Sequence, residues 1–173
     1  MAFNEVQSSY LVPLKDINAT VGTWALTLAS NILSLDKSAA DNTSVLHIPV
    51  NVPRRADFYG VQITGVNVFA VVTTADLDAA PTLVLSRQDY DLVDATAGAT
   101  SAVSATTIAT TAGAGVVVTA DANDRLWSFA VDSPAADYGT EVKCDYHAAL
   151  TINAAAGSVV KIYGVEVTYK DLV

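Results

Sequence analysis

Asp145 and His147 are the two residues whose types and spacing come nearest to catalytic chemistry. Two residues apart on a β-strand, they would project from the same face and could act as the acid and base of a hydrolase. A serine nucleophile would have to come from another strand. The sequence has no Gly-x-Ser-x-Gly turn, phosphate-binding loop or dinucleotide-binding fingerprint. We therefore interpret the pair as solvated side chains and predict neither catalytic residues nor enzyme activity.

Three groups of aspartates carry the oxygen ligands that calcium prefers. They are Asp76 with Asp78, Asp89 with Asp91 and Asp94, and Asp121 with Asp124. None has the spacing of the twelve-residue calcium loop that ends in a bidentate Glu. Aspartate is also common in turns, because its side chain accepts hydrogen bonds from the nearby backbone. We therefore expect turn-forming side chains, with no bound metal and no cofactor.

Cys144 is the single cysteine of the chain, so no internal disulfide can form. It falls on the apolar side of an alternating stretch, whereas His147 falls on the polar side. Successive side chains of a strand point to opposite faces, which excludes a Cys-His dyad within this stretch. We predict a buried, inert thiol.

The elements that would position these residues are β-strands. From 141 to 153 apolar and polar residues alternate, and a second alternation follows from 162 to 170. A period of two excludes a helix and suits an antiparallel sheet with one buried face. We predict that these two strands form a closing hairpin.

Shorter alternations begin at Trp24, Leu46, Phe58, Thr82 and Arg125, and a weak strand is predicted around 103–108 within the Ala/Thr/Gly-rich segment 93–114. About eight strands separated by turn signals, with no convincing helix, predict an all-β fold: a two-sheet antiparallel β-sandwich over residues 24–173. Long connections between the sheets favour a jelly roll over an immunoglobulin-like arrangement.

Two strands carry irregularities. The strand from Phe58 changes the phase of its alternation at Thr64-Gly65, which indicates a β-bulge. Pro49 and Pro53 lie on the polar side of the strand from Leu46, and proline cannot donate a ladder hydrogen bond. That strand is therefore predicted to be an edge strand or to be paired only in part.

Residues 1–23 show neither a helical stripe nor a long alternation, and they are predicted to form an extended N-terminal arm. Large apolar residues are rare in disordered tails. The arm contains four of them, so we predict that it lies on a neighbouring subunit and that its contact residues are Phe3, Tyr10, Leu11 and Leu14. A frayed terminus is the alternative.

The composition limits the classes of partner. The chain has 173 residues, enough for one domain, and its net charge of −9 repels nucleic acid and anionic membrane surfaces. Charged residues make up 16% of the chain, below the usual value of about 25%, while 51% are apolar. These values predict contact with other subunits. The first residues lack the pattern of a signal peptide, and no apolar run approaches the length of a membrane span.

Several stretches together resemble small virion proteins of tailed bacteriophages, in particular the jelly-roll capsid decoration, or cement, proteins. They are Trp24–Leu28, Leu46–Val50 followed by Val52–Arg54, Gly60–Val66, Thr73–Leu77, Lys161–Val165 and Thr168–Lys170. The resemblance implies a homotrimer that binds the major capsid protein on the outside of an icosahedral head and stabilises it. It also implies synthesis in the host cytoplasm, location on the virion and no catalytic residues.

Two other hypotheses remain. A carbohydrate-binding β-sandwich used in host adhesion would need exposed aromatic side chains or a calcium loop. A sandwich-fold hydrolase would need a third group beside Asp145 and His147.

Overall fold

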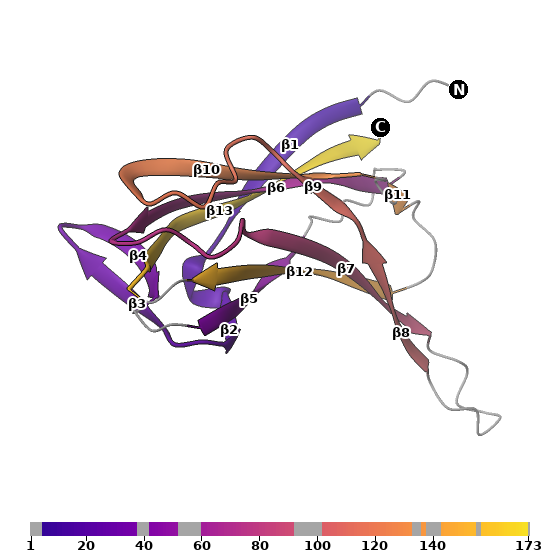
Figure 1. The fold of residues 1–173 in the computed structure, drawn as a ribbon. Coiled ribbons are helices and arrows are strands. Elements are labelled where there is room, and N and C mark those ends of the chain that lie inside the picture. The colour runs from indigo at the N-terminus through magenta and orange to yellow at the C-terminus, as the bar shows by residue number, and fades with distance from the viewer. Residues whose placement is uncertain are drawn as a thin grey trace.

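Two antiparallel sheets face each other in the computed structural model, which describes residues 5–37, 42–51, 60–91, 102–132, 136–137, 143–154 and 157–172 (Figure 1). Among these residues the larger sheet has eight strands and the smaller has five. The larger sheet runs in the order β3 (Trp24–Ala29), β4 (Ile32–Lys37), β13 (Val159–Leu172), β6 (Gly60–Thr73), β10 (Asp121–Val131) and β9 (Thr110–Ala112), while β1 (Glu5–Val12) also pairs with β13 and β11 (Ala136–Asp137) with β6. The smaller sheet runs β2 (Asn18–Val21), β5 (Asn42–Val50), β12 (Lys143–Ala154), β7 (Thr82–Asp91) and β8 (Ala102–Ile108).

Eight of these strands follow the order of a jelly roll. In chain order these eight strands are β4, β5, β6, β7, β8, β10, β12 and β13. The larger sheet contains the first, eighth, third and sixth of them, as β4-β13-β6-β10. The smaller sheet contains the second, seventh, fourth and fifth, as β5-β12-β7-β8. This is the arrangement of two intertwined Greek keys. The predicted jelly-roll sandwich is confirmed, including the weak strand around 103–108, which is β8.

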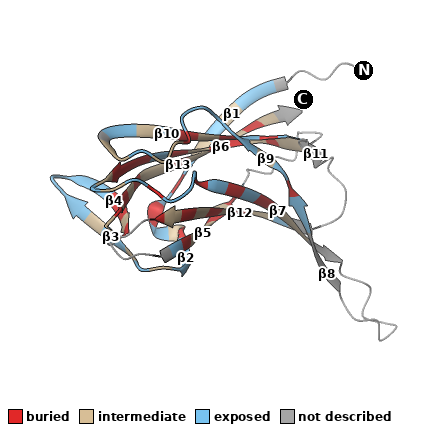
Figure 2. Ribbon diagram, viewed as in Figure 1, coloured by how far each residue is buried: buried red, intermediate tan, exposed pale blue. Residues whose placement is uncertain are grey.

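The core lies between the sheets and is built from alternate positions of the strands (Figure 2). In β12, Ala148, Leu150 and Ile152 are buried, whereas Asp145 is exposed and His147 is half-buried. The opposite layer is supplied mainly by β6, β10 and β13, with the large buried side chains Val66, Val68, Val72, Trp127, Phe129 and Ile162. Each such side chain contributes about 1.5–3 kcal/mol through removal of apolar surface from water. The alternation predicted for β12 is confirmed from Asp145 to Asn153.

The predicted β-bulge lies in β6. Thr168 of β13 pairs with Gly65 and Tyr169 pairs with Ile63, so Thr64 is the extra residue. The bulge turns the even positions after it towards the core. At Gly65 a Cβ atom would stand 2.9 Å from the carbonyl oxygen of Phe129, which explains why this position has no side chain.

The expected closing hairpin is wrong. β12 pairs with β5 and β7 in the smaller sheet, whereas β13 pairs with β1, β4 and β6 in the larger one. Between Ala154 and Val159 the chain crosses from one sheet to the other. Alternation shows which face of a strand is buried, but it carries no information about which strand is its neighbour.

The expected N-terminal arm is also wrong for residues 5–21. β1 pairs with β13 along its whole length, and β2 pairs with β5. Val12, Leu14 and Ile17 belong to the core, and Leu14–Asp16 form a short 3₁₀ helix (η1) between the two strands. The alternation of β1 was hidden because the apolar Leu11 is exposed while the polar Ser8 is half-buried. The sandwich therefore begins well before residue 24.

Pro49 lies in an interior strand that is paired only in part. β5 sits between β2 and β12, but its pairing with β2 ends at His47. Pro49 lies beyond that point, so its lack of an N–H group costs no hydrogen bond to β2. Pro53 lies outside the described residues. No helix in the described part of the chain is long and apolar enough to cross a membrane.

Candidate functional site

Asp145 and His147 lie on the outer face of the smaller sheet, as predicted. Ser86 of β7 is the register partner of His147, and the ring of His47 lies 6.0 Å from that of His147 between centroids. No hydrogen bond joins Ser86, His147 and Asp145, and both strands are interior, so their backbone amides serve the sheet. An acyl-transfer site needs a hydrogen-bonded nucleophile and base and also free donors for an oxyanion. This arrangement gives the hydrolase hypothesis no support.

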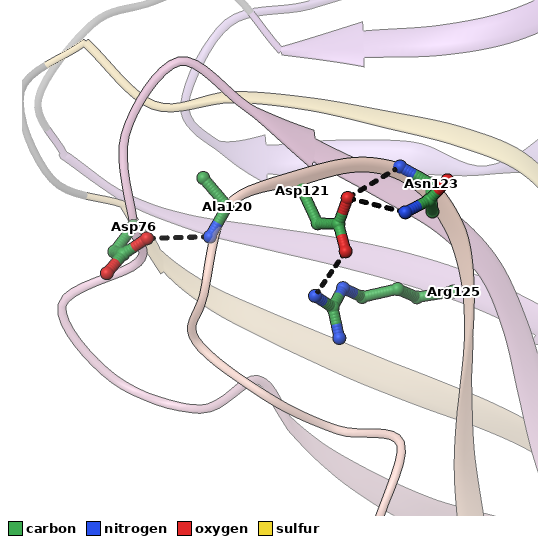
Figure 3. A network of polar contacts seen from close by, with 5 residues as sticks. All are labelled: Asp76, Ala120, Asp121, Asn123 and Arg125. Atoms are coloured by element: carbon green, nitrogen blue, oxygen red, sulfur yellow. Dashed lines mark hydrogen bonds and ion pairs between the residues drawn. The ribbon is translucent and has the colours of Figure 1, made fainter.

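Two of the aspartates considered as calcium ligands, Asp76 and Asp121, bond to groups of the protein itself (Figure 3). The Asp76 carboxylate accepts a hydrogen bond of 2.7 Å from the backbone amide of Ala120. Asp121 accepts two from Asn123, at 3.1 Å from its backbone and 2.7 Å from its side chain, and pairs with Arg125 at 3.3 Å. No group of three metal-ligating side chains occurs in the described part of the chain. Asp121 agrees with the turn-forming interpretation, whereas Asp76 links its loop to a second one 44 residues further along the chain.

Two predictions fall outside what is described. The side chains of Asp89 and Asp91, and the whole of Asp94, lie outside the described residues. The same holds for the side chain of Cys144 in β12, whose backbone pairs with Asp89 of β7. The inert thiol therefore stays a prediction.

Phe69 is an exposed aromatic residue that the sequence analysis missed. Trp127 is fully buried and Trp24 is half-buried, but the Phe69 side chain is 39% exposed on the outer face of the larger sheet. The signal was present in the sequence, because a bulge at Thr64 that turns Val68 and Ala70 inward must turn Phe69 outward.

The ring of Phe69 lies over a glycine. Gly164 of β13 is its register partner, and a Cβ atom at position 164 would stand 3.5 Å from Cδ2 of Phe69. On the other side, Phe69 pairs with the exposed Leu126 of β10. The absence of a side chain at Gly164 leaves room beside the ring.

That room is part of an open hollow of about 620 Å³, which we call the apolar hollow. It forms where β13 exchanges one neighbour for another: pairing with β4 ends at Ile162 and pairing with β1 begins at Val165. Tyr163, the extra residue of a bulge in β13, lies at this junction. The lining is apolar except for Asp124 and the Tyr163 hydroxyl, and comprises Leu11, Val12, Leu14, Ile32, Phe69, Asp124, Tyr163 and Gly164.

A row of polar side chains adjoins the apolar hollow on the same face. Asn67, two residues before Phe69, donates a hydrogen bond of 3.0 Å to the Glu166 carboxylate. Hydrogen bonds from Asn67 and then from Ser9 hold the pKa of Glu166 below its ordinary value. One row further, the hydroxyl groups of Thr64 and Thr168 are 3.1 Å apart. The face therefore combines an aromatic ring, a carboxylate, an amide and hydroxyl groups.

The four contact residues predicted near the N-terminus have different positions. Leu11 is 69% exposed and lines the apolar hollow, while Leu14 is buried. Tyr10 packs against the core, with its ring 6.2 Å from that of Tyr169, and burial raises its pKa. Phe3 lies outside the described residues. Leu14 is thus buried within its own chain. Among the three described residues, Leu11 is the one whose side chain is exposed enough to contact a partner.

Comparison with known proteins identified no family. No protein-family model and no curated protein matches the chain. Among solved structures, a family 29 carbohydrate-binding module from Piromyces equi is similar over 94% of this chain and 90% of its own, with 11% identity and a TM-score of 0.45. CBM86, a low-affinity xylan-binding module from Roseburia intestinalis, is similar over 94% of both chains, with 11% identity and a TM-score of 0.40. At these values neither similarity carries an argument about this chain.

Proposed function

We propose that this protein is a carbohydrate-binding β-sandwich and that it binds sugar on the outer face of the larger sheet. The observation that carries the proposal is the exposed ring of Phe69 above Gly164, beside the polar row of Ser9, Asn67 and Glu166. A sugar ring has faces of C–H groups and a rim of hydroxyl groups. An aromatic side chain packs against such a face, while carboxylate and amide groups bond the rim.

The polar row is held in place before any ligand arrives. The Glu166 carboxylate has about four acceptor positions, and the hydrogen bonds from Asn67 and Ser9 occupy two of them. The remaining positions can accept hydrogen bonds from sugar hydroxyls without a change of side-chain conformation. Less conformational freedom is then lost on binding, which favours affinity.

The electrostatics of the site favour an uncharged ligand. The chain carries a net charge of −9, and both Asp124 and Glu166 place carboxylates at or beside the apolar hollow. Polysaccharides that contain uronic acids or sulfate would meet like charges there. We therefore assign the site to neutral polysaccharides.

The decoration role stays a prediction that follows from the sequence resemblance. No contact described above bears on a major capsid protein, on a homotrimer or on location in a virion. The exposed aromatic side chain that the carbohydrate hypothesis required is present in Phe69. For that reason we place carbohydrate binding first.

Native gel electrophoresis through embedded polysaccharides tests the proposal. We expect retardation by at least one neutral polysaccharide, such as xylan, mannan or a β-glucan, and none by alginate. Phe69→Ala should weaken binding about tenfold, corresponding to about 1.4 kcal/mol for a lost aromatic contact. Val84→Ala is the matched control, because Val84 is 41% exposed but lies on the outer face of the smaller sheet. Absence of retardation by every neutral polysaccharide, or equal binding by the two variants, would overturn the proposal.

A further inference from the structure

The β3–β4 hairpin carries large apolar side chains that the rest of its own chain leaves exposed. Leu26, Leu28, Ile32 and Leu33 are all exposed, and the Leu28 side chain is 68% accessible. Ser30 and Asn31 form a two-residue turn with φ values of 50° and 65°, as in the tight turns that join adjacent strands. No residue from 17 to 35 carries a charge. Figure 1 shows this hairpin at one end of the molecule.

β3 also has a free edge. It is the last strand in the order of the larger sheet, and no other strand in the described part of the chain pairs with its second side. Ala29 and Ile32 flank the turn as a hydrogen-bonded pair, so Leu28–Leu33 and Leu26–Leu35 are non-hydrogen-bonded pairs. The backbone N–H and C=O groups of Leu26 and Leu28 therefore point away from β4, towards the open edge.

Edge strands of soluble proteins usually carry a feature that prevents association. Such features are a proline, an inward-pointing charge, a lysine or a bulge. β3 reads Trp-Ala-Leu-Thr-Leu-Ala and has none of them, and its pairing with β4 is regular. An unprotected apolar edge of this kind is suited to pairing with another strand.

We propose that β3 pairs with β3 of a second copy of this chain, antiparallel and about a two-fold axis at Thr27. In that register Leu26 of each copy faces Leu28 of the other, and the outward N–H and C=O groups of these leucines form four hydrogen bonds. The strand is thus complementary to itself, as a two-fold interface requires. A second copy also carries a charge of −9, so the repulsion between copies favours contact at a surface without charges such as this hairpin.

The pairing has a consequence for ligand binding that rests on the proposed function. A two-fold axis between antiparallel strands is perpendicular to the sheet, so the larger sheets of two copies continue into each other. Their outer faces, and both apolar hollows, then lie on the same side. One polysaccharide chain could bind both, which raises the apparent affinity without any new contact.

Sedimentation and cysteine cross-linking test the pairing without any sugar. Sedimentation equilibrium should give twice the 18.0 kDa chain mass. Leu28→Lys should give the single chain mass, whereas Leu11→Lys, at an equally exposed leucine outside the hairpin, should leave the dimer intact. A mass of one or three chains for the unmodified protein, or equal effects of the two lysines, would overturn the proposal.

Cross-linking tests the register. Thr27 would face its own copy in a non-hydrogen-bonded pair, where Cα atoms are about 4.5 Å apart and a disulfide can form. Under mild oxidation, Thr27→Cys should give a covalent dimer on a non-reducing gel. Ala25→Cys, on the same face and strand, should not, because position 25 faces position 29 of the other copy. The unmodified protein is the control for cross-linking through Cys144, the single native cysteine. Equal cross-linking by both variants would contradict the two-fold axis at Thr27.

Discussion

The ring of Phe69 lies above Gly164, with Cδ2 of the ring 3.5 Å from the place that a Cβ atom at position 164 would take. The two residues are register partners on β6 and β13, and both line the apolar hollow. The position of the ring therefore depends on the size of the residue at 164. This dependence allows the site to be altered without removal of its aromatic side chain.

Gly164→Ala and Gly164→Val test whether ligand binding needs the room that Gly164 leaves beside the Phe69 ring. A Cβ atom at 3.5 Å makes ordinary van der Waals contact, so the alanine variant should bind polysaccharide as the unmodified protein does. The additional methyl groups of valine would displace the Phe69 ring and narrow the hollow. We expect this variant to bind at least about tenfold more weakly, or about 1.4 kcal/mol, by calorimetry. Equal binding by both variants would show that the ring does not contact the ligand.

Glu166 should make stability depend on pH in the acid range. Its pKa in the folded protein is lowered from 4.5, chiefly by the hydrogen bond from Asn67. The unfolded chain then binds more protons, so this contribution is fully present above about pH 4.5 and is lost as pH falls through the lowered pKa. The difference in melting temperature between the unmodified protein and Glu166→Gln should shrink on acidification.

Asn67→Ala provides an independent check of the cause. Without the amide donor, the pKa of the Glu166 carboxyl should rise towards 4.5 when it is followed by NMR of the carboxyl carbon. Ser128→Ala, on the neighbouring strand opposite Asn67, is a suitable control. A Glu166 pKa that is the same in all three proteins would show that Asn67 does not stabilise the carboxylate.

The alternation of side chains accounts for what could be predicted of the fold. A period of two identified the strands, and the phase change at Thr64-Gly65 identified the bulge. The pairing of strands could not be predicted from this alternation, because contacts between residues far apart in the chain decide which strands are neighbours. For that reason alternation alone predicts a hairpin of β12 and β13 and an N-terminal arm, whereas β13 pairs with β6 and β1 pairs with β13.

The candidate site was less predictable than the fold. Phe69 alone followed from the bulge and the alternation after it. The apolar hollow did not, because it depends on β4 and β1 meeting end to end along β13. The hydrogen bond between Asn67 and Glu166 joins residues 99 positions apart, on strands whose pairing the sequence did not reveal.

The two faces of β12 should differ sharply in their sensitivity to substitution. Leu150 and Ile152 are fully buried between the sheets. Leu150→Ala should lower the free energy of unfolding by about 2–5 kcal/mol through lost burial and a residual cavity. His147→Ala, on the half-buried outer face of the same strand, should cost less than about 1 kcal/mol. Urea denaturation measures both, and a greater loss from His147→Ala would indicate a role for the pair with His47.

Leu14 and Leu11 offer the sharpest test of the N-terminal segment, because they lie three residues apart in opposite environments. Leu14 is 8% exposed within the core, whereas Leu11 is 69% exposed. Leu14→Ala should therefore cost about 2–5 kcal/mol and Leu11→Ala less than about 1 kcal/mol in urea denaturation.

Deletion of residues 1–21 extends the same argument to the whole segment. The truncation removes three core side chains, Val12, Leu14 and Ile17, and also the strand that pairs with β13 from Val165 to Leu172. Buried leucine-sized side chains contribute several kcal/mol each when a cavity remains, and the stability of a domain is about 5–15 kcal/mol in total. We expect the truncated protein to lose cooperative thermal unfolding. If it instead melts as the full chain does, with Leu14→Ala also harmless, the segment is an arm after all and its pairing with β13 does not support the fold.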